Sequence, residues 1–157
     1  MRCNAFHVVL LIVLACTSGC APQVQWHGYL FDPVHNDARQ RGAPTLVYFR
    51  SWYLPECTEF ENKVLTDADV IAATRTCRNA NIDFDWNKTL GEKWGVRQAP
   101  AVVLLNAKGE LLSMLQGTIT ARALTAMLEV NLGLAAPKEA TSQPAAPLRE
   151  DLASQPE

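Results

Sequence analysis

Residues 43–61 read A-P-T-L-V-Y-F-R-S-W-Y-L-P-E-C-T-E-F-E, and this stretch decides the fold of the chain. Its apolar run at 46–49 predicts a buried strand. After a short break the pattern becomes helical, because Phe60 and Val64 are spaced to share one face of a helix. Pro55 suits the first turn of such a helix, where its missing N–H costs little. The stretch therefore predicts a strand, a short turn and a helix.

One cysteine, Cys57, falls in the first turn of the predicted helix, near the positive end of the helix dipole. A strand, a turn and a cysteine at a helix N-terminus are the usual setting for thiol chemistry. A redox pair needs a second cysteine three residues earlier, and that position holds Leu54. The motif has the setting of a dithiol site but lacks its first sulfur.

A second run of elements fills the downstream half of the chain. It comprises W-G-V-R-Q-A-P at 94–100, an apolar strand at 101–105, a turn at 106–109, a strand at 110–115, Gly117, and an amphipathic helix at 120–132 that stops at Gly133. With residues 43–61, this order resembles the thioredoxin fold, in which a cis-proline faces the active-site turn. The helix start C-T-E-F-E is most similar to the thioredoxin-like domain of periplasmic thiol-disulfide interchange proteins.

The resemblance covers about residues 32–133, and it implies one α/β domain. We expect a thioredoxin-like fold with a central mixed β-sheet flanked by helices on both faces. Between and before the two halves we expect three further elements: a helix from an Asp32 N-cap to Arg41, a half-buried strand at 80–86, and a short helix at 89–94. The helix that starts near Pro55 should break at Thr66-Asp67, which is a capping signal.

The resemblance also implies what the site lacks. Thioredoxins carry Trp-Cys-x-x-Cys where this chain has Y-L-P-E-C at 53–57. Alignment places Leu54 at the position of the attacking cysteine and Cys57 at that of the resolving one. The strand position that holds a buried acid in thioredoxin is Tyr48 here. Two-electron dithiol exchange therefore has no route.

Two interpretations of Cys57 stay open. It is either a lone reactive thiol, whose pKa the helix dipole lowers, or a small apolar residue kept for packing. Pairing with Cys77 is not expected, because some fifteen helical residues of about 1.5 Å rise separate the two sulfurs by far more than a disulfide spans.

The second candidate site is a peptide-binding surface. The resemblance implies that Ala99-Pro100 is cis and that the backbone of Ala99 then pairs with an extended segment of a partner, the alternative being a proline that only begins a strand. Exposed aromatic residues beside that edge are frequent anchors for such a segment. The candidate binding residues are Trp52, Tyr53, Leu54, Pro55, Ala99 and Pro100.

The first nineteen residues resemble a lipoprotein signal peptide. Arg2 provides a short positive region, and the apolar core at 5–15 is too short to span a bilayer. Small residues precede Cys20, which we interpret as the lipidated residue, with Cys16 as the alternative. An ordinary cleaved signal peptide is the other alternative. In each case the mature protein lies in the cell envelope outside the cytoplasm, on the periplasmic side, where disulfides persist.

The remaining segments carry no predicted chemistry. Residues 20–31 are interpreted as a tether and an edge segment, and 134–157 as a disordered tail rich in proline and alanine. His27 and His35 have no cysteine or carboxylate cluster at ligand spacing, so we expect solvated surface histidines and no metal site. A net charge of −2 and the absence of a glycine-rich phosphate loop exclude nucleic-acid and nucleotide partners, and no cofactor is expected.

Two hypotheses of function follow. The first is a membrane-anchored thioredoxin-like lipoprotein with a degenerate active site that binds a polypeptide partner. The second is a thiol-disulfide oxidoreductase or redox sensor that uses Cys57 alone.

Overall fold

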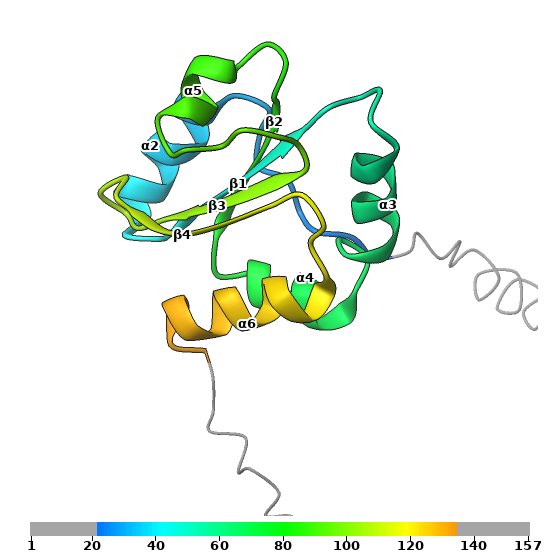
Figure 1. Cartoon of the computed structure of the whole chain (residues 1–157). Coiled ribbons are helices and arrows are strands. Elements are labelled where there is room, and N and C mark those ends of the chain that lie inside the picture. The colour runs from blue at the N-terminus through cyan, green and yellow to red at the C-terminus, as the bar shows by residue number, and fades with distance from the viewer. Residues whose placement is uncertain (1–21, 135–157) are drawn as a thin grey trace, which may run out of the picture.

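The computed structural model describes residues 22–134, which form a four-stranded sheet and five helices (Figure 1). The expected signal peptide, Cys16, Cys20 and most of the expected tail lie outside the described residues. In chain order the elements are α2 (Phe31–Arg41), β1 (Thr45–Arg50), α3 (Pro55–Lys63), α4 (Ala68–Thr74), β2 (Arg78–Asp83), α5 (Lys88–Glu92), β3 (Ala101–Leu105), β4 (Leu111–Gln116) and α6 (Ala121–Leu132).

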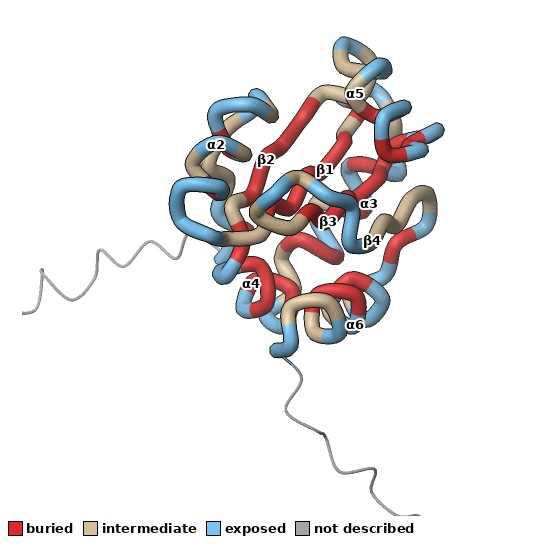
Figure 2. The backbone as a smooth tube through the Cα atoms, turned by 90° about the vertical axis from the view of Figure 1, so that its left-hand side faces the viewer, coloured by how far each residue is buried: buried red, intermediate tan, exposed pale blue. Residues whose placement is uncertain are grey.

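The sheet is mixed, with strand order β2-β1-β3-β4. β1 pairs in parallel with β2 and antiparallel with β3, so that Val47 lies opposite Ala80 on one side and Val103 on the other. β4 pairs antiparallel with β3. Both inner strands are buried along almost their whole length, which explains their continuous apolar sequences (Figure 2). The expected mixed sheet with helices on both faces is confirmed.

Two apolar clusters cover the two faces of the sheet. On one face α2 and the segment around Trp94 pack against alternate residues of β1 and β3, including Val47 and Phe49. On the other face α3, α4 and α6 pack against Leu46 and Tyr48 (Figure 1). The side-chain period of two along β1 thus divides its residues between two cores. Both layers depend on this strand.

The segment before α2 lies along the outer edge of β2. The Nδ2 atom of Asn79 donates to the carbonyl oxygen of Gln25 at 2.9 Å, and Gly28 forms a parallel bridge with Ala80. The Trp26 ring stacks on the Tyr48 ring with 5.8 Å between centroids. The segment thereby covers backbone groups that an edge strand would otherwise expose.

Several predicted boundaries differ from those of the structure. α2 begins at Phe31 with Leu30 as its N-cap, and Asp32 lies inside the first turn, where it makes no capping bond. β2 ends at Asp83 and does not reach Trp86. The reason is local: the Asp83 carboxylate accepts the N–H groups of Asp85 and Trp86, at 2.9 and 3.2 Å, and so turns the chain away from the sheet.

The histidines are not solvated surface residues, contrary to expectation. His27 Nδ1 accepts the backbone N–H of Asn79 at 2.9 Å, and His35 Nδ1 lies 2.9 Å from the Thr45 hydroxyl. Both rings are half-buried, and burial lowers the pKa of each. Within residues 22–134 no group of three histidine, cysteine or acidic side chains is arranged to hold a metal ion. None of the helices in that range is long and apolar enough to cross a membrane.

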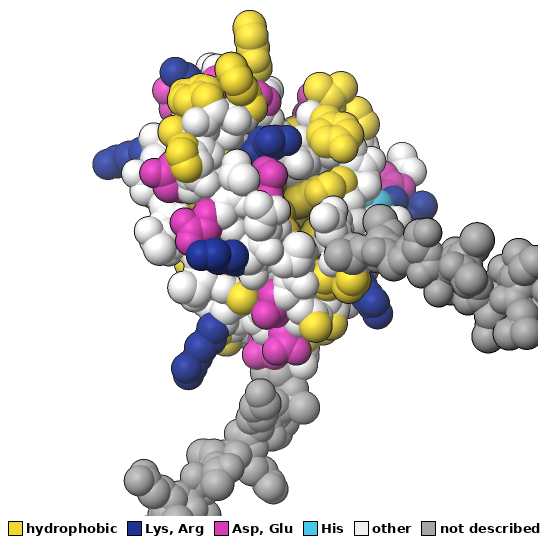
Figure 3. All heavy atoms as spheres, turned by 90° about the vertical axis from the view of Figure 1, so that its right-hand side faces the viewer, with side chains coloured by type: hydrophobic (Ala, Val, Ile, Leu, Met, Phe, Trp, Pro, Cys, Tyr) yellow, Lys and Arg dark blue, Asp and Glu magenta, His cyan; other side chains and the backbone are white. Residues whose placement is uncertain are grey.

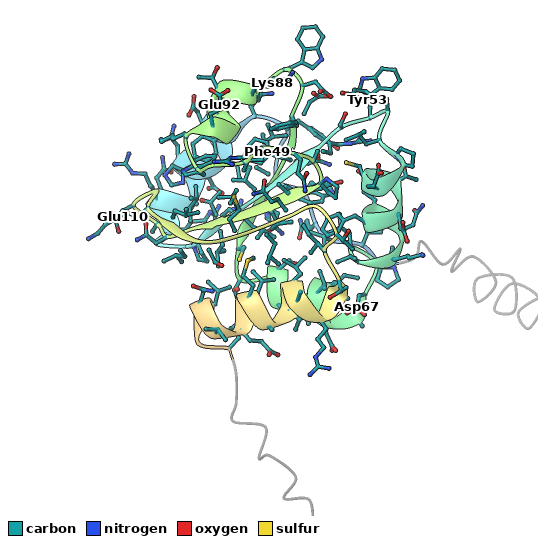
Figure 4. All side chains as sticks on the ribbon, in the orientation of Figure 1. Phe49, Tyr53, Asp67, Lys88, Glu92 and Glu110 are labelled. Carbon is teal, nitrogen blue, oxygen red and sulfur yellow. The ribbon has the colours of Figure 1, made fainter. Side chains whose placement is uncertain are left out.

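The predicted break after α3 is confirmed, and Asp67 makes it. Its carboxylate accepts the N–H groups of Asp69 and Val70 at 3.0 and 3.2 Å and caps α4 (labelled in Figure 4). The cap lets the chain turn and bring Val70 and Ile71 into the core shared with α6. A straight helix would carry these residues past that core.

We expect Asp67→Ala to lower the free energy of unfolding by about 1 kcal/mol, because it leaves two N–H groups without their acceptor. Urea denaturation of the variant measures the change. Asp69→Ala is the matched control, since it removes an acidic residue from the same turn without touching the cap, and Asp67→Asn should retain most of the stability. Equal losses in the Asp67→Ala and Asp69→Ala variants would contradict the assignment.

Candidate functional site

The turn between β1 and α3, together with the first turn of α3, carries most of the predicted site residues. Leu54 donates its N–H to the Ser51 carbonyl at 3.4 Å and serves as the N-cap of α3. Pro55 follows at the first helical position, as predicted. The Leu54 carbonyl then accepts the N–H of Cys57 at 3.1 Å. These bonds place Cys57 one turn into the helix, facing the sheet.

Cys57 is almost fully buried, with 1% of its surface exposed. Its Sγ atom accepts the backbone N–H of Ser51 at 3.3 Å. Burial raises the pKa of the Cys57 thiol above its ordinary value, and the Ser51 N–H and the Tyr48 hydroxyl only partly oppose that effect. The net pKa is therefore raised, contrary to the first interpretation, which expected the helix start to lower it. These features favour a packing role.

Cys57 forms no disulfide with the other described cysteine. Cys57 and Cys77 are both free and both buried. Burial raises the pKa of Cys77 to about 11. Position 54, which alignment gives to the attacking cysteine, holds a half-buried leucine whose side chain has no redox chemistry. The described residues hold no dithiol couple.

Tyr48, Arg50 and Glu61 form a polar network beneath the turn. The sequence analysis did not identify Glu61 as part of the site. The Tyr48 hydroxyl donates to Glu61 Oε1 at 3.2 Å, and Arg50 Nε lies 3.2 Å from the same oxygen. Burial, with the nearby Cys57 and Glu61, raises the pKa of Tyr48, so its hydroxyl remains a donor. Glu61 follows Cys57 by four residues, a spacing that puts both on one helical face and is the sequence signal by which Glu61 could have been found.

The turn also presents an aromatic surface. Trp52 and Tyr53 are 71% and 57% exposed, and their rings meet edge to face at 5.6 Å. Asp85, from the loop after β2, accepts the Ser51 hydroxyl at 2.6 Å and the Tyr53 hydroxyl at 3.0 Å. Figure 4 shows Tyr53 at the outer tip of the β1–α3 connection, and Figure 3 shows hydrophobic side chains standing out at that end of the domain.

Asp85 and Trp86 were also missed from the sequence. Because the expected strand ran to residue 86, both were placed in the sheet. The structure instead puts Asp85 where it ties the two loops together, and it leaves Trp86 85% exposed. These two hydrogen bonds, one part-buried and one exposed, connect the aromatic turn to the loop after β2. No local sequence signal joins positions 51 and 85, which are 34 residues apart.

The Ala99–Pro100 peptide bond is cis, as predicted. Both residues are buried, and the Pro100 carbonyl accepts the N–H of Gly117 at 2.8 Å. Ala99 itself forms no backbone hydrogen bond with another described residue. Its N–H and carbonyl at the start of β3 thus have no backbone partner among the described residues.

A hollow of about 320 Å³ joins the proline to α3. Pro100 and residues 117–121 line one side of it, and Glu56, Phe60 and other residues of α3 line the opposite side. The structure thus brings the cis-proline and the start of α3 together. The predicted surface divides into exposed residues (Trp52, Tyr53, Pro55), a half-buried one (Leu54) and buried ones (Ala99, Pro100).

Comparison with known proteins gives the same fold. The chain is similar to the oxidoreductase DsbH at 17% identity and a TM-score of 0.61, over 73% of this chain and 88% of that one. It is similar to a putative disulphide-isomerase from Bacteroides thetaiotaomicron at 20% identity and a TM-score of 0.61, over 71% of this chain and 95% of that one. A thioredoxin from Thermus thermophilus matches at 22% identity and a TM-score of 0.60, over 67% and 85%.

At these identities the structural matches show the fold alone. No curated protein matches the sequence. The family assignment comes from a model of the thioredoxin-like domain, which matches residues 31–131. This range runs from the start of α2 almost to the end of α6 and so includes the cis-proline and the aromatic turn. The chain belongs to the thioredoxin-like domain family.

Proposed function

We propose that this protein is a lipid-anchored thioredoxin-like protein of the cell envelope that binds an extended polypeptide partner without exchanging disulfides. One observation carries the proposal. At the position where the family has its dithiol, this chain has an exposed aromatic turn held by hydrogen bonds to Asp85, and Cys57 behind the turn is buried. The recognition surface is present, and the sulfur that begins the exchange is replaced by Leu54.

The binding half of the proposal is supported by the backbone of Ala99. An N–H and a carbonyl without a partner in the described residues, at the beginning of a strand, are the groups that pair with an added strand. Trp52 and Tyr53 provide large exposed contact area on the turn that follows β1, at the end of the sheet where Phe49 pairs with Ala101. Because Asp85 already fixes the Tyr53 hydroxyl, binding immobilises little that is not already ordered.

The burial and the raised pKa of Cys57 argue against disulfide exchange. A thiol must ionise and reach its target before it attacks a disulfide. Cys57 is 1% exposed and its pKa is raised, so few thiolates form at neutral pH and those that do are covered. The second candidate function, a redox site that uses this cysteine alone, is favoured by one contact: the Ser51 N–H, which donates to Sγ and stabilises a thiolate.

The anchor is proposed from the sequence alone, on Cys20, with Cys16 as the alternative. Mass spectrometry of the mature N-terminus tests it. We expect an acylated cysteine at position 20, and Cys20→Ala should release the protein from the membrane fraction. A mature chain that begins at an unmodified residue would contradict the anchor without affecting the binding site.

We expect the double variant Trp52→Ala, Tyr53→Ala to bind a reduced, alkylated unfolded polypeptide at least about tenfold more weakly than the unaltered protein, because it loses both anchors. Fluorescence anisotropy of the labelled polypeptide measures affinity, and urea denaturation should show little change since both side chains are exposed. Tyr29→Ala is the matched control, as Tyr29 is a 71% exposed aromatic residue outside the turn. Equal loss in the control would refute the site.

We expect Cys57 to resist alkylation by iodoacetamide in the native protein at neutral pH and to react fully in guanidinium chloride. The raised pKa leaves less thiolate at neutral pH than an ordinary cysteine has, so native reactivity should increase only as the pH rises past the ordinary cysteine range. Peptide mapping by mass spectrometry separates Cys57 from Cys77. Rapid labelling of native Cys57 at neutral pH would favour the redox alternative.

Cys57→Ser should leave polypeptide binding unchanged, which binding to the same labelled chain would show. Loss of binding in this variant, with stability retained, would favour the redox alternative.

A further inference from the structure

The hollow beside the cis-proline has an apolar floor and a charged rim. Phe60 and Val64 of α3 and Ile119 from the β4–α6 connection are 3%, 5% and 8% exposed and form the floor. Glu56, Glu59 and Lys63 line the same hollow from α3 and are solvent-exposed. Figure 3, which views the side that carries α3, shows acidic and basic side chains close together on this face.

The charges of the rim do not cancel. Lys63 Nζ donates to Glu59 Oε1 at 2.7 Å, so these two neutralise each other. Glu56, one turn before Glu59, forms no ion pair or side-chain hydrogen bond with another described residue. The Lys63 ammonium also lowers the pKa of Glu59, which keeps it ionised. One net negative charge therefore stands above an apolar floor.

An apolar floor below a negatively charged rim favours some side chains of a partner over others. A purely apolar side chain would fill the floor but strip water from the rim carboxylates, which is unfavourable. A lysine or arginine side chain lays its aliphatic stem on apolar surface and keeps its charge at the opening. The volume of about 320 Å³ accommodates one such chain. A glutamate of the partner would meet repulsion from Glu56.

We infer that this hollow receives a lysine or arginine side chain of the bound polypeptide, with Glu56, unpaired among the described residues, as the residue that recognises the cation. The inference rests on the proposed function, since Pro100 lines the hollow and a segment paired with Ala99 runs past it. It adds a specificity determinant to a site that otherwise recognises backbone and apolar surface. The partner segment carries a basic residue beside the position that meets the cis-proline.

The probes for the test are N-acetyl-lysine N-methylamide and N-acetyl-norleucine N-methylamide, which differ by the terminal ammonium. Each is titrated into the mature protein while NMR follows the methyl signals of Val64 and Ile119. We expect the lysine probe to bind roughly threefold more tightly, as an exposed ion pair allows, and the difference to vanish at high salt. Equal affinities, or tighter binding of norleucine, would overturn the inference.

Variants of the charged rim residues test whether their charges cause the preference for the lysine probe over the norleucine probe. Glu56→Gln should abolish the preference for lysine, and Lys63→Gln should increase it, because it releases Glu59 from its ion pair. Glu110→Gln is the matched control, as Glu110 lies at the opposite end of the sheet (labelled in Figure 4) and should change nothing. A purely structural role for the rim does not predict opposite effects from Glu56 and Lys63. Loss of preference in the Lys63→Gln variant would contradict the inference.

The unfolded-polypeptide assay separates failure of this inference from failure of the proposed function. If the alkylated chain binds through the aromatic turn and the two probes bind equally, the hollow does not recognise a cation and the proposed function stands. If the chain does not bind at all, the proposed function fails, whatever the two probes do.

Discussion

The burial of β1 on both faces is the constraint on which the rest of the structure depends. Its residues alternate between the cluster under α2 and the cluster under α3, α4 and α6, so each face needs its own layer of helices. Hydrogen bonds to β2 and β3 on its two sides fix its position in the sheet. Because the strand cannot shift, the turn that follows it appears at one place, with Cys57 directed inward and Trp52 outward.

Leu54 stands where the resemblance to thioredoxins places a first cysteine, and burial determines the chemistry of the thiol that remains. In this chain the turn is closed by hydrogen bonds to Asp85, and the remaining thiol is covered and protonated. A reactive thiol needs access and a stabilised thiolate, and burial removes both. Binding of an extended partner, as proposed, requires no thiol, so the burial of Cys57 leaves that proposal standing.

Tyr48 shows how such a site remains folded without its acid. The phenol is buried between Trp26 and Phe60, where its ring adds apolar contact on both sides, and its hydroxyl reaches Glu61. A buried carboxylate in the strand would need a partner, whereas a tyrosine satisfies one polar atom and packs with the rest. Glu61, at the surface end of this contact, is paired with Arg50 and remains partly hydrated.

The sequence by itself determined the break at Asp67 and the absence of a partner sulfur at Leu54, because each depends on local pattern or on spacing within one element. The fold and the cis bond at Pro100 were expected from the resemblance of both halves of the chain to the thioredoxin fold. The sequence did not determine the end of β2, the contacts of His27 and His35, or the hydrogen bond between Ser51 and Asp85. Those depend on which distant segments meet, and alternation alone cannot tell a strand from a turn closed by an aspartate. Whether Cys57 is reactive was also decided by tertiary structure, since the helix start favours a thiolate and only the depth of burial shows that desolvation outweighs it.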